Sequence, residues 1–330
     1  VIDFNGCEDT LEVEVTEPSV LAAVEVDSMA TTCNGGSDGW AVVAGAGGTE
    51  PYDYWWDDDL NQVSDTATGL KSGVYKAAVT DFRGCSDTVD ITITQPDTIS
   101  PNDSIVNLSC AGLCDGAITL NVSGGTKGAG YTHSWSVASA DTFITNLCAN
   151  TYTDTITDGA GCKDTFSFVV IEPDTLESMI SDTTHILCYG DSTGVAIVTP
   201  SGGTAPYTYD WYDAPGGITD STATGLPSGT YNAEVTDENG CRDTSVVEIT
   251  EPSELILGSD SIPATCTGIC TGSAIVVPSG GVDPYNVDWY TVGGMPTTDT
   301  ASGLCAGFYD VAVIDFNGCE DTLEVEVTEP

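Results

Sequence analysis

Cysteine offers this sequence its most distinctive chemistry, because thirteen copies recur at similar places along 330 residues. One set lies in Cys-x-Gly loops, and another follows a glycine at the end of a short turn. Cysteines that recur in pairs at fixed places indicate a disulfide framework and an oxidising compartment. We therefore expect an extracellular protein whose thiols are structural.

The first and last cysteines of each repeating unit are expected to bond to each other, since both recur in every unit. The expected bonds are Cys33 with Cys85, Cys110 with Cys162, Cys188 with Cys241, and Cys266 with Cys319. A second pair is present or absent jointly, which predicts bonds of Cys114 with Cys148 and of Cys270 with Cys305. Cys7 is left unpaired, and we expect its partner in a truncated unit upstream. Zinc binding at the Cys-x-x-x-Cys spacing is disfavoured, because two units lack it and histidine is almost absent.

Catalytic chemistry is not expected from the other residues. The two histidines, His133 and His185, stand at unrelated places in the units, so the units share no candidate base. Serine elbows, phosphate loops and metalloprotease motifs do not occur. We expect neither enzyme activity nor a cofactor.

The charge balance limits the partners. Fifty-one acidic residues against six basic ones give a net charge of −45, which disfavours nucleic acid and anionic membranes. No apolar run approaches the roughly 18 residues that span a bilayer, so we expect no membrane insertion. Most carboxylates are expected to form a solvated surface, with dedicated cation sites as the alternative.

The segment from Val1 to Pro18 occurs again, residue for residue, as Val313 to Pro330, an offset of 312 residues (313 minus 1). Weaker copies end at Pro96, Pro173 and Pro252. We therefore divide the chain into the C-terminal hairpin of a truncated preceding repeat (1–18), repeat 1 (19–96), repeat 2 (97–173), repeat 3 (174–252) and repeat 4 (253–330). The chain is expected to be a window from a longer repetitive protein.

Each repeat has the pattern of a small all-β sandwich, because bulky residues alternate with polar ones between glycine-rich turns. A tryptophan ends the aromatic strand of every repeat and is expected to anchor the core, with carbohydrate stacking as the alternative. A leucine, a short turn and a tyrosine follow, as in the tyrosine corner of immunoglobulin-like sandwiches. Only Glu-Pro or Gln-Pro separates the repeats. We expect tandem immunoglobulin-like β-sandwich domains in a rigid rod.

The landmarks of the units, taken together, resemble the SprB repeat of very large surface adhesins from gliding Bacteroidota. Repeat 3 carries them best, in Ser201 to Thr204, Pro206 to Trp211, Gly225 to Tyr231 and Val235 to Cys241. Repeat 2 departs from the pattern, with Lys127-Gly-Ala-Gly where proline is expected. The resemblance implies a surface filament that type IX secretion exports, that the gliding machinery moves, and that grips surfaces or polysaccharide.

A short motif, Asp followed by Ser or Thr and then by an apolar residue or Thr, is overabundant. It resembles the O-glycosylation signal of that phylum, although turn chemistry and the composition also favour it. The candidate hydroxyl residues are Thr10, Ser28, Thr66, Thr88, Thr98, Ser104, Thr142, Thr155, Thr165, Thr175, Thr183, Ser192, Ser221, Ser261, Thr300 and Thr322.

Two functional hypotheses follow. The leading one is a structural and adhesive stalk, whose partners are further copies of the repeat, surface polysaccharide and the gliding machinery. The alternative is an extracellular binding module. Such a module would grip glycan through exposed aromatics such as Tyr212 or Tyr290, or calcium through carboxylates such as Asp81 and Asp315.

Overall fold

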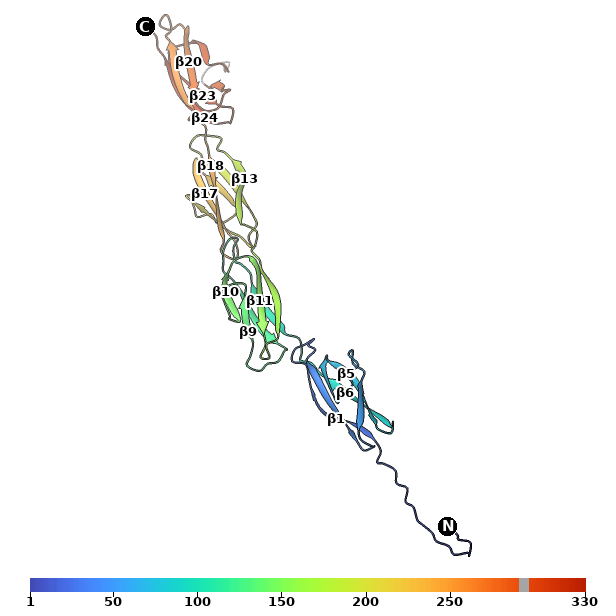
Figure 1. Ribbon diagram of the computed structural model, residues 1–330. Coiled ribbons are helices and arrows are strands. Elements are labelled where there is room, and N and C mark those ends of the chain that lie inside the picture. The colour runs from blue at the N-terminus through green and yellow to red at the C-terminus, as the bar shows by residue number, and fades with distance from the viewer. Residues whose placement is uncertain (291–296) are drawn as a thin grey trace. The chain divides into compact units, whose positions relative to one another are not determined.

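The computed structural model describes residues 1–290 and 297–330, which form strands β1 to β24. The chain makes two compact units, one of residues 1–107 and 114–171 and the other of residues 108–113 and 172–330. The first unit holds the strands of repeats 1 and 2, and the second holds those of repeats 3 and 4 (Figure 1). Within the described ranges, no helix is long and apolar enough to cross a membrane.

The described residues of every repeat form six strands. Repeat 1 has β1 (Ala22–Met29), β2 (Gly39–Ala46), β3 (Tyr52–Trp56), β4 (Thr66–Leu70), β5 (Gly73–Asp81) and β6 (Ser86–Ile93). Repeat 2 has β7 (Ser100–Val106), β8 (Gly116–Ser123), β9 (Thr132–Trp135), β10 (Phe143–Leu147), β11 (Asn150–Thr157) and β12 (Lys163–Val170). Repeat 3 has β13 (Glu177–Thr184), β14 (Gly194–Ser201), β15 (Thr208–Tyr212), β16 (Thr222–Leu226), β17 (Gly229–Thr236) and β18 (Arg242–Ile249). Repeat 4 has β19 (Ile256–Ile262), β20 (Gly272–Ser279), β21 (Asn286–Trp289), β22 (Thr300–Leu304), β23 (Gly307–Ile314) and β24 (Glu320–Val327).

The strand order is the same in all four repeats. The first, second and fourth strands form one antiparallel sheet, and the third, fifth and sixth form the other, as in β1-β2-β4 and β3-β5-β6. In an immunoglobulin constant domain, strands A, B, E and D share one sheet and C, F and G form the other. Among the residues that the structure describes, each repeat therefore has the immunoglobulin order without strand D. The predicted all-β, immunoglobulin-like fold is confirmed.

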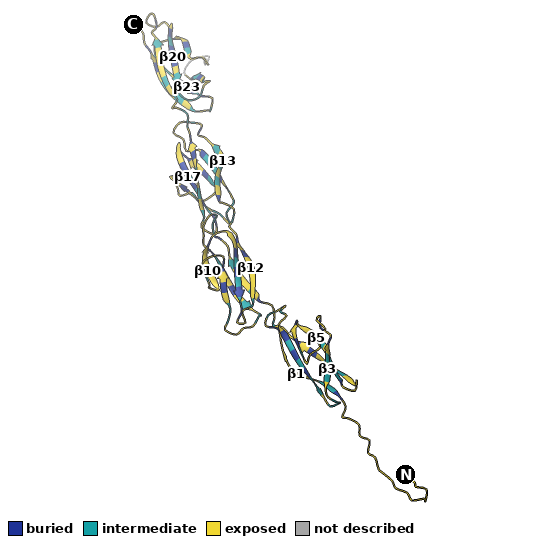
Figure 2. Cartoon of the chain, in the orientation of Figure 1, coloured by how far each residue is buried: buried dark blue, intermediate teal, exposed yellow. Residues whose placement is uncertain are grey.

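The core of each repeat lies between its two sheets, where alternate side chains of the facing strands are buried (Figure 2). A tryptophan at or next to the end of the third strand, which is the aromatic strand, lies at the centre of each core. Trp56, Trp135, Trp211 and Trp289 are 0%, 7%, 2% and 0% exposed. Each indole N–H donates to a backbone carbonyl of the connection that follows, at 2.8 to 3.1 Å. The prediction of core anchors is confirmed, because buried indoles cannot stack on carbohydrate.

The tyrosine corner is also present in every repeat. The hydroxyl groups lie 2.9 to 3.1 Å from the backbone carbonyl four residues earlier. The tyrosines are Tyr75, Tyr152, Tyr231 and Tyr309. This bond fixes the turn before the fifth strand to that strand, as the sequence pattern predicted.

The two identical segments adopt different structures. In the second copy, β24 pairs with β23 and buries Val325 and Val327. In the first copy the equivalent residues form no strand, and Leu11, Val13 and Val15 are 87%, 70% and 90% exposed. Its turn is nevertheless kept, because the Asp3 carboxylate accepts the backbone N–H groups of Asn5 and Cys7 at 2.8 and 2.9 Å. The expected hairpin is therefore present only at its turn, since residues 9–16 have no partner strand.

Candidate functional site: the disulfide joints

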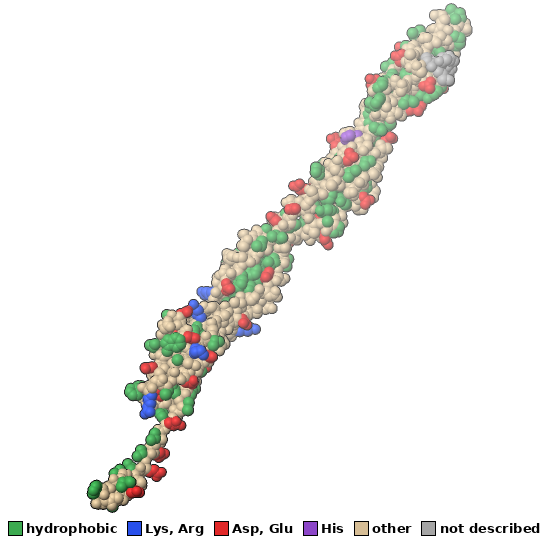
Figure 3. Space-filling model, turned by 90° about the vertical axis from the view of Figure 1, so that its right-hand side faces the viewer, with side chains coloured by type: hydrophobic (Ala, Val, Ile, Leu, Met, Phe, Trp, Pro, Cys, Tyr) green, Lys and Arg blue, Asp and Glu red, His purple; other side chains and the backbone are tan. Residues whose placement is uncertain are grey.

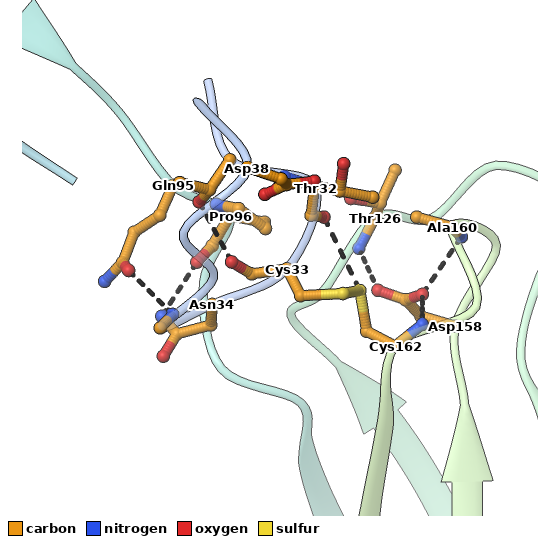
Figure 4. The surroundings of a disulfide bond; sticks show 12 residues. Thr32, Cys33, Asn34, Asp38, Gln95, Pro96, Thr126, Asp158, Ala160 and Cys162 are labelled. Carbon is orange, nitrogen blue, oxygen red and sulfur yellow. Dashed lines mark hydrogen bonds between the residues drawn. A yellow bond between two sulfur atoms is a disulfide. The ribbon is translucent and has the colours of Figure 1, made fainter. Parts of the chain in front are cut away.

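Three disulfide bonds join consecutive repeats. Each bond connects the Cys-x-Gly loop of one repeat to the Gly-Cys turn of the next, with sequence separations of 129, 131 and 131 residues. The pairs are Cys33 with Cys162, Cys110 with Cys241, and Cys188 with Cys319. Figure 4 shows the first of these joints. Bonds at these positions tie each repeat covalently to its neighbour.

The predicted bonds between the first and last cysteines of one repeat are wrong. In repeat 1 the loop of Cys33 lies beside the end of β6, where Gly35 N–H donates to the Gln95 side chain at 2.9 Å. Cys85, however, precedes the start of β6. Eight residues of strand at about 3.4 Å each place these ends about 27 Å apart, whereas bonded cysteines need Cα atoms within about 7 Å. The same strand separates the two cysteines in every repeat.

The other cysteines divide into two groups. Cys114 bonds to Cys148 and Cys270 to Cys305, each within one repeat, as the joint presence of these cysteines predicted. Cys7, Cys85 and Cys266 are free and exposed within this chain. The predicted bonds of Cys85 with Cys33 and of Cys266 with Cys319 are therefore absent. Cys33 and Cys319 bond instead to cysteines of neighbouring repeats.

One side of each joint is the Cys-x-Gly loop, which we call the plug: residues 31–36 of repeat 1 and their equivalents. In repeat 1, Asn34 Nδ2 donates to the carbonyl of Pro96 at 2.9 Å, and Gly36 N–H donates to the carbonyl of Cys33 at 3.0 Å. Gly35 has a φ of 73°, in the left-handed region that glycine adopts without strain. These bonds hold the plug against the Gln-Pro or Glu-Pro segment that ends its own repeat.

The other side is the socket, built around a buried aspartate of the following repeat. The Asp158 carboxylate accepts the backbone N–H groups of Thr126 at 2.7 Å, Ala160 at 3.0 Å and Cys162 at 2.9 Å. It thereby fastens the Gly-Gly turn to the Gly-Cys turn. Asp81, Asp237 and Asp315 occupy the same position and are buried too.

The electrostatics of the socket follow from these bonds. Burial raises the pKa of Asp81, but backbone N–H groups of Cys85, Thr49 and Arg83 outweigh it and hold the pKa below the ordinary 3.8. Burial and backbone N–H groups act in the same way on Asp158, whose pKa is also lowered. Both oxygens of each carboxylate accept protein N–H groups. This arrangement uses the carboxylates as structural acceptors.

We expect the melting temperature of the chain to fall as the pH decreases below 3.8. The native pKa of Asp81 lies below the unfolded one, so its stabilisation is complete above 3.8 and is lost as the pH falls through the native value. The Asp81→Asn variant keeps an acceptor but no charge. Its deficit in melting temperature against the wild type should therefore shrink between about pH 6 and about pH 2. A deficit that stays constant would contradict the proposed role of the charge.

An asparagine adds a contact across two of the joints. Asn239 Nδ2 donates to the carbonyl of Ser109 at 3.0 Å, and Asn317 Nδ2 donates to the carbonyl of Leu187 at 2.9 Å. Each carbonyl belongs to the residue just before the plug cysteine. Repeat 2 has Ala160 at this position, so its joint lacks the amide bond.

We expect Asn239→Ala to accelerate the reduction of the Cys110–Cys241 bond by dithiothreitol about fivefold, because a hydrogen bond of about 1 kcal/mol is lost. The Cys188–Cys319 bond in the same molecule, which keeps Asn317, serves as the control and should react at its original rate. Quenched alkylation and peptide mapping measure both rates. Equal acceleration of the two bonds would show that the amide does not protect its own joint.

All the candidate O-glycosylation residues are exposed or half-buried, so burial removes none of them. Several lie in strands, where the carboxylate of the preceding aspartate accepts the N–H of the Ser or Thr at 2.8 to 2.9 Å. Examples are Ser28, Thr165, Thr183, Ser261 and Thr322. This bond gives the Asp-Ser/Thr pattern a structural reason that is independent of modification.

One polar pair was not anticipated. In repeat 2, His133 Nδ1 lies 2.6 Å from Asp154 Oδ2, and both side chains are almost fully buried. Asp154 also accepts the N–H of Ser134 at 2.9 Å, while His133 Nε2 has no hydrogen-bond partner among the described residues. The alternation of β11 places Asp154 on the inward face, so the strand pattern contained this signal.

The surface shows scattered carboxylates over the visible face (Figure 3). In the described residues, no three His, Cys, Asp or Glu side chains are grouped to hold a metal ion. Tyr212 and Tyr290, the aromatics expected to meet glycan, are both exposed. Each hydroxyl donates to a neighbouring carboxylate, Glu234 at 3.0 Å and Glu320 at 3.4 Å. The bond to Glu234 raises the pKa of Tyr212.

Comparison with known families finds one match. The family model of the SprB repeat matches residues 102–139 and 180–216. These segments run from the first strand of repeats 2 and 3 to just beyond the aromatic strand, and they include the plugs of Cys110 and Cys188. A search of curated proteins finds no match.

Among solved structures, the chain is similar to tandem-domain proteins. The eight N-terminal immunoglobulin domains of Down Syndrome Cell Adhesion Molecule align over 95% of this chain and 60% of that one, with 10% identity and a TM-score of 0.32. Three immunoglobulin domains of titin align over 72% and 99%, with 13% identity and a TM-score of 0.27. Surface layer protein SbsC aligns over 94% and 54%, with 14% identity and a TM-score of 0.24. The immunoglobulin-like fold of the chain follows from its strand order.

Proposed function

We propose that this chain, two segments of which match the family model of the SprB repeat, is a stalk segment of a large repetitive adhesin outside the cell. The finer proposal is that the stalk serves gliding motility and surface attachment, after export by type IX secretion. Each repeat, with the boundaries 19–96, 97–173, 174–252 and 253–330, is proposed to be one folding domain of a rigid rod.

The observation that carries the proposal is the set of bonds between repeats. A binding module gains nothing from a covalent link to its neighbour, whereas a load-bearing stalk gains resistance to separation at every joint. The buried aspartate of the socket recurs in all four repeats, and repetition favours a structural use. A disulfide framework also requires an oxidising environment, which supports an extracellular location.

Two experiments test the proposal in the native source. An antibody against this chain should label intact, unpermeabilised cells, and labelling only after permeabilisation would contradict a surface location. An in-frame deletion of residues 19–330 should shorten the surface filament while a binding tip elsewhere in the parent keeps its affinity. Loss of ligand affinity without a change of filament length would instead identify these repeats as binding modules.

Glycan binding is the second candidate, because Tyr212 and Tyr290 present exposed rings beside carboxylates. Such pairs resemble sites that stack a sugar and bind its hydroxyl groups. Binding of the intact chain to a glycan array, and its loss in Tyr212→Ala, would support this function. A calcium role would need ligands other than Asp81 and Asp315, whose oxygens accept backbone N–H groups. O-glycosylation of the exposed candidates remains a proposal that an intact mass of native protein tests.

A further inference from the structure

We propose that Cys85 and Cys266 are the two halves of a fourth joint, in which the plug of repeat 4 bonds to the socket of repeat 1 in a following copy of the 312-residue block. The partner is thus a second copy of this chain's own repeats, in tandem. The inference concerns a specific bond and does not depend on the proposed stalk function.

The first support is the socket at Cys85, which is complete. Asp81 accepts the N–H groups of Thr49 at 3.0 Å and of Arg83 and Cys85 at 2.9 Å, as Asp158 does in the bonded joint. Gly48 N–H donates to the carbonyl of Ser19 at 2.8 Å. The corresponding bond of repeat 2, from Gly125 to Asp97, measures 2.9 Å.

The second support is the pocket that these residues line. Leu21, Gly48, Asp81 and Cys85 line a pocket in repeat 1. Their equivalents in repeat 2, Ile99, Gly125, Asp158 and Cys162, line a pocket that also contains Cys33 and Asn34 from the plug of repeat 1. Plug residues thus line the pocket in repeat 2 and are missing from its counterpart in repeat 1, so a plug is the occupant that the pocket at Cys85 fits.

The third support is the plug at Cys266, which has the geometry of the bonded plugs. Gly268 N–H donates to Glu329 Oε2 at 2.8 Å, and Thr267 Oγ1 donates to the carbonyl of Pro330 at 3.2 Å. Ile269 N–H donates to the carbonyl of Cys266 at 3.1 Å. The bonds of Gly35, Asn34 and Gly36 in repeat 1 are the direct counterparts.

The fourth support is the spacing along the sequence. Val1 to Pro18 is identical to Val313 to Pro330, so the residues that precede repeat 1 are those that end repeat 4. If a second 312-residue block follows this one, its Cys85 lies 131 residues after Cys266 of the first block (85 plus 312, minus 266). That is the separation within the pairs Cys110–Cys241 and Cys188–Cys319. Arg83 in this socket and Glu329 beside this plug also carry opposite charges, which favours their approach.

Bond formation needs an oxidant of the disulfide class, such as glutathione disulfide. The thiolate of Cys266 attacks the oxidant and releases one glutathione thiolate, which leaves a mixed disulfide at Cys266. The Cys85 thiolate then attacks the Cys266 sulfur and releases the second glutathione. The two protein thiols lose two protons and two electrons in total, and the oxidant becomes two thiols.

The test is a fusion in which residues 19–330 follow Pro330 of the intact chain, oxidised with glutathione disulfide. If the fourth joint forms, the fusion keeps three free thiols, as the single chain does, and a peptide map shows Cys266 linked to Cys85 of the second block. Without it, five thiols remain free: the original three plus Cys85 and Cys266 of the added block. Five free thiols, or Cys266 bonded to Cys319, would overturn the proposal.

Matched variants sharpen the result. Cys266→Ser in the first block should leave Cys85 of the second block as a free thiol. Cys7→Ser should leave the bond between Cys266 and Cys85 intact. A peptide map of protein from the native source gives a second measurement that needs no refolding. It should contain a cross-linked peptide pair with Cys85 and Cys266, and a pair of Cys85 with Cys33 would contradict the proposal.

Discussion

The fully stretched length between Cys33 and Cys319 is expected to be about tenfold shorter in the oxidised chain than in the reduced chain when force unfolds it. The shortest covalent path between these residues crosses the bonds Cys33–Cys162 and Cys188–Cys319 and only the 26 residues from 162 to 188 (188 minus 162). At about 3.5 Å per residue this path is about 90 Å long, whereas the 286 residues of the reduced chain (319 minus 33) reach about 1,000 Å.

Single-molecule pulling in the presence and absence of reductant measures this difference. Cys188→Ser should lengthen the oxidised path from 26 to 61 residues. The path then runs from 162 to 148, from 114 to 110, from 241 to 270 and from 305 to 319 (14 plus 4 plus 29 plus 14), over the bonds Cys148–Cys114, Cys110–Cys241 and Cys270–Cys305. The matched control is Cys114→Ser in the otherwise wild-type chain. Its bond to Cys148 does not lie on the 26-residue path, so its loss should leave the oxidised extension unchanged. Equal extension of the oxidised and reduced wild type would show that the joints bear no load.

The second large effect is expected from Asp237→Ala, which should destabilise repeat 3 by about 3 kcal/mol or more. The Asp237 carboxylate accepts the N–H groups of Thr204, Asn239 and Cys241 at 2.8 to 2.9 Å in a buried site. Each buried donor left without an acceptor costs about 1–3 kcal/mol. Hydrogen exchange of the backbone amides in β17 and β18 measures the local free energy of opening.

Two variants control this prediction. Asp220→Ala removes an exposed carboxylate and should change stability by less than about 0.5 kcal/mol. Asp237→Asn keeps one acceptor oxygen for the Gly-Cys turn but presents an amide to Thr204 N–H, so it should recover only part of the loss. If Asp237→Ala and Asp220→Ala had equal effects, the aspartate would not be the centre of the socket.

The fold of a single repeat could be predicted from the sequence because its signals are local. Alternation marks the strands, Trp211 stands next to the end of an aromatic strand, and Tyr231 follows the leucine turn at a fixed spacing. The left-handed bulge at Gly69 was not predicted, since its position depends on how β2 and β4 pair.

The disulfide partners could not be predicted from the recurrence of the cysteines, because every repeat contains both a plug cysteine and a Gly-Cys cysteine. Pairing within a repeat and pairing with the next repeat both require two such cysteines in every repeat. An odd total number of cysteines is compatible with both. The decisive information was the strand between the two cysteines. Residues 86–93 alternate as a strand, so Cys85 and the plug lie at opposite ends of one repeat. The bonds of Cys114 and Cys270 were predicted because their presence or absence is correlated between repeats.

The spacing of the joint cysteines also imposes an order in time on the maturation of the chain. Each plug cysteine has its partner 129 or 131 residues later, in a socket that the next repeat must fold first. Cys114, by contrast, needs only the 34 residues to Cys148. If repeats fold in the order in which they are made, the plug thiol of the newest repeat stays reactive until its successor has matured. A single labelled plug cysteine would then mark how far maturation has advanced along the array.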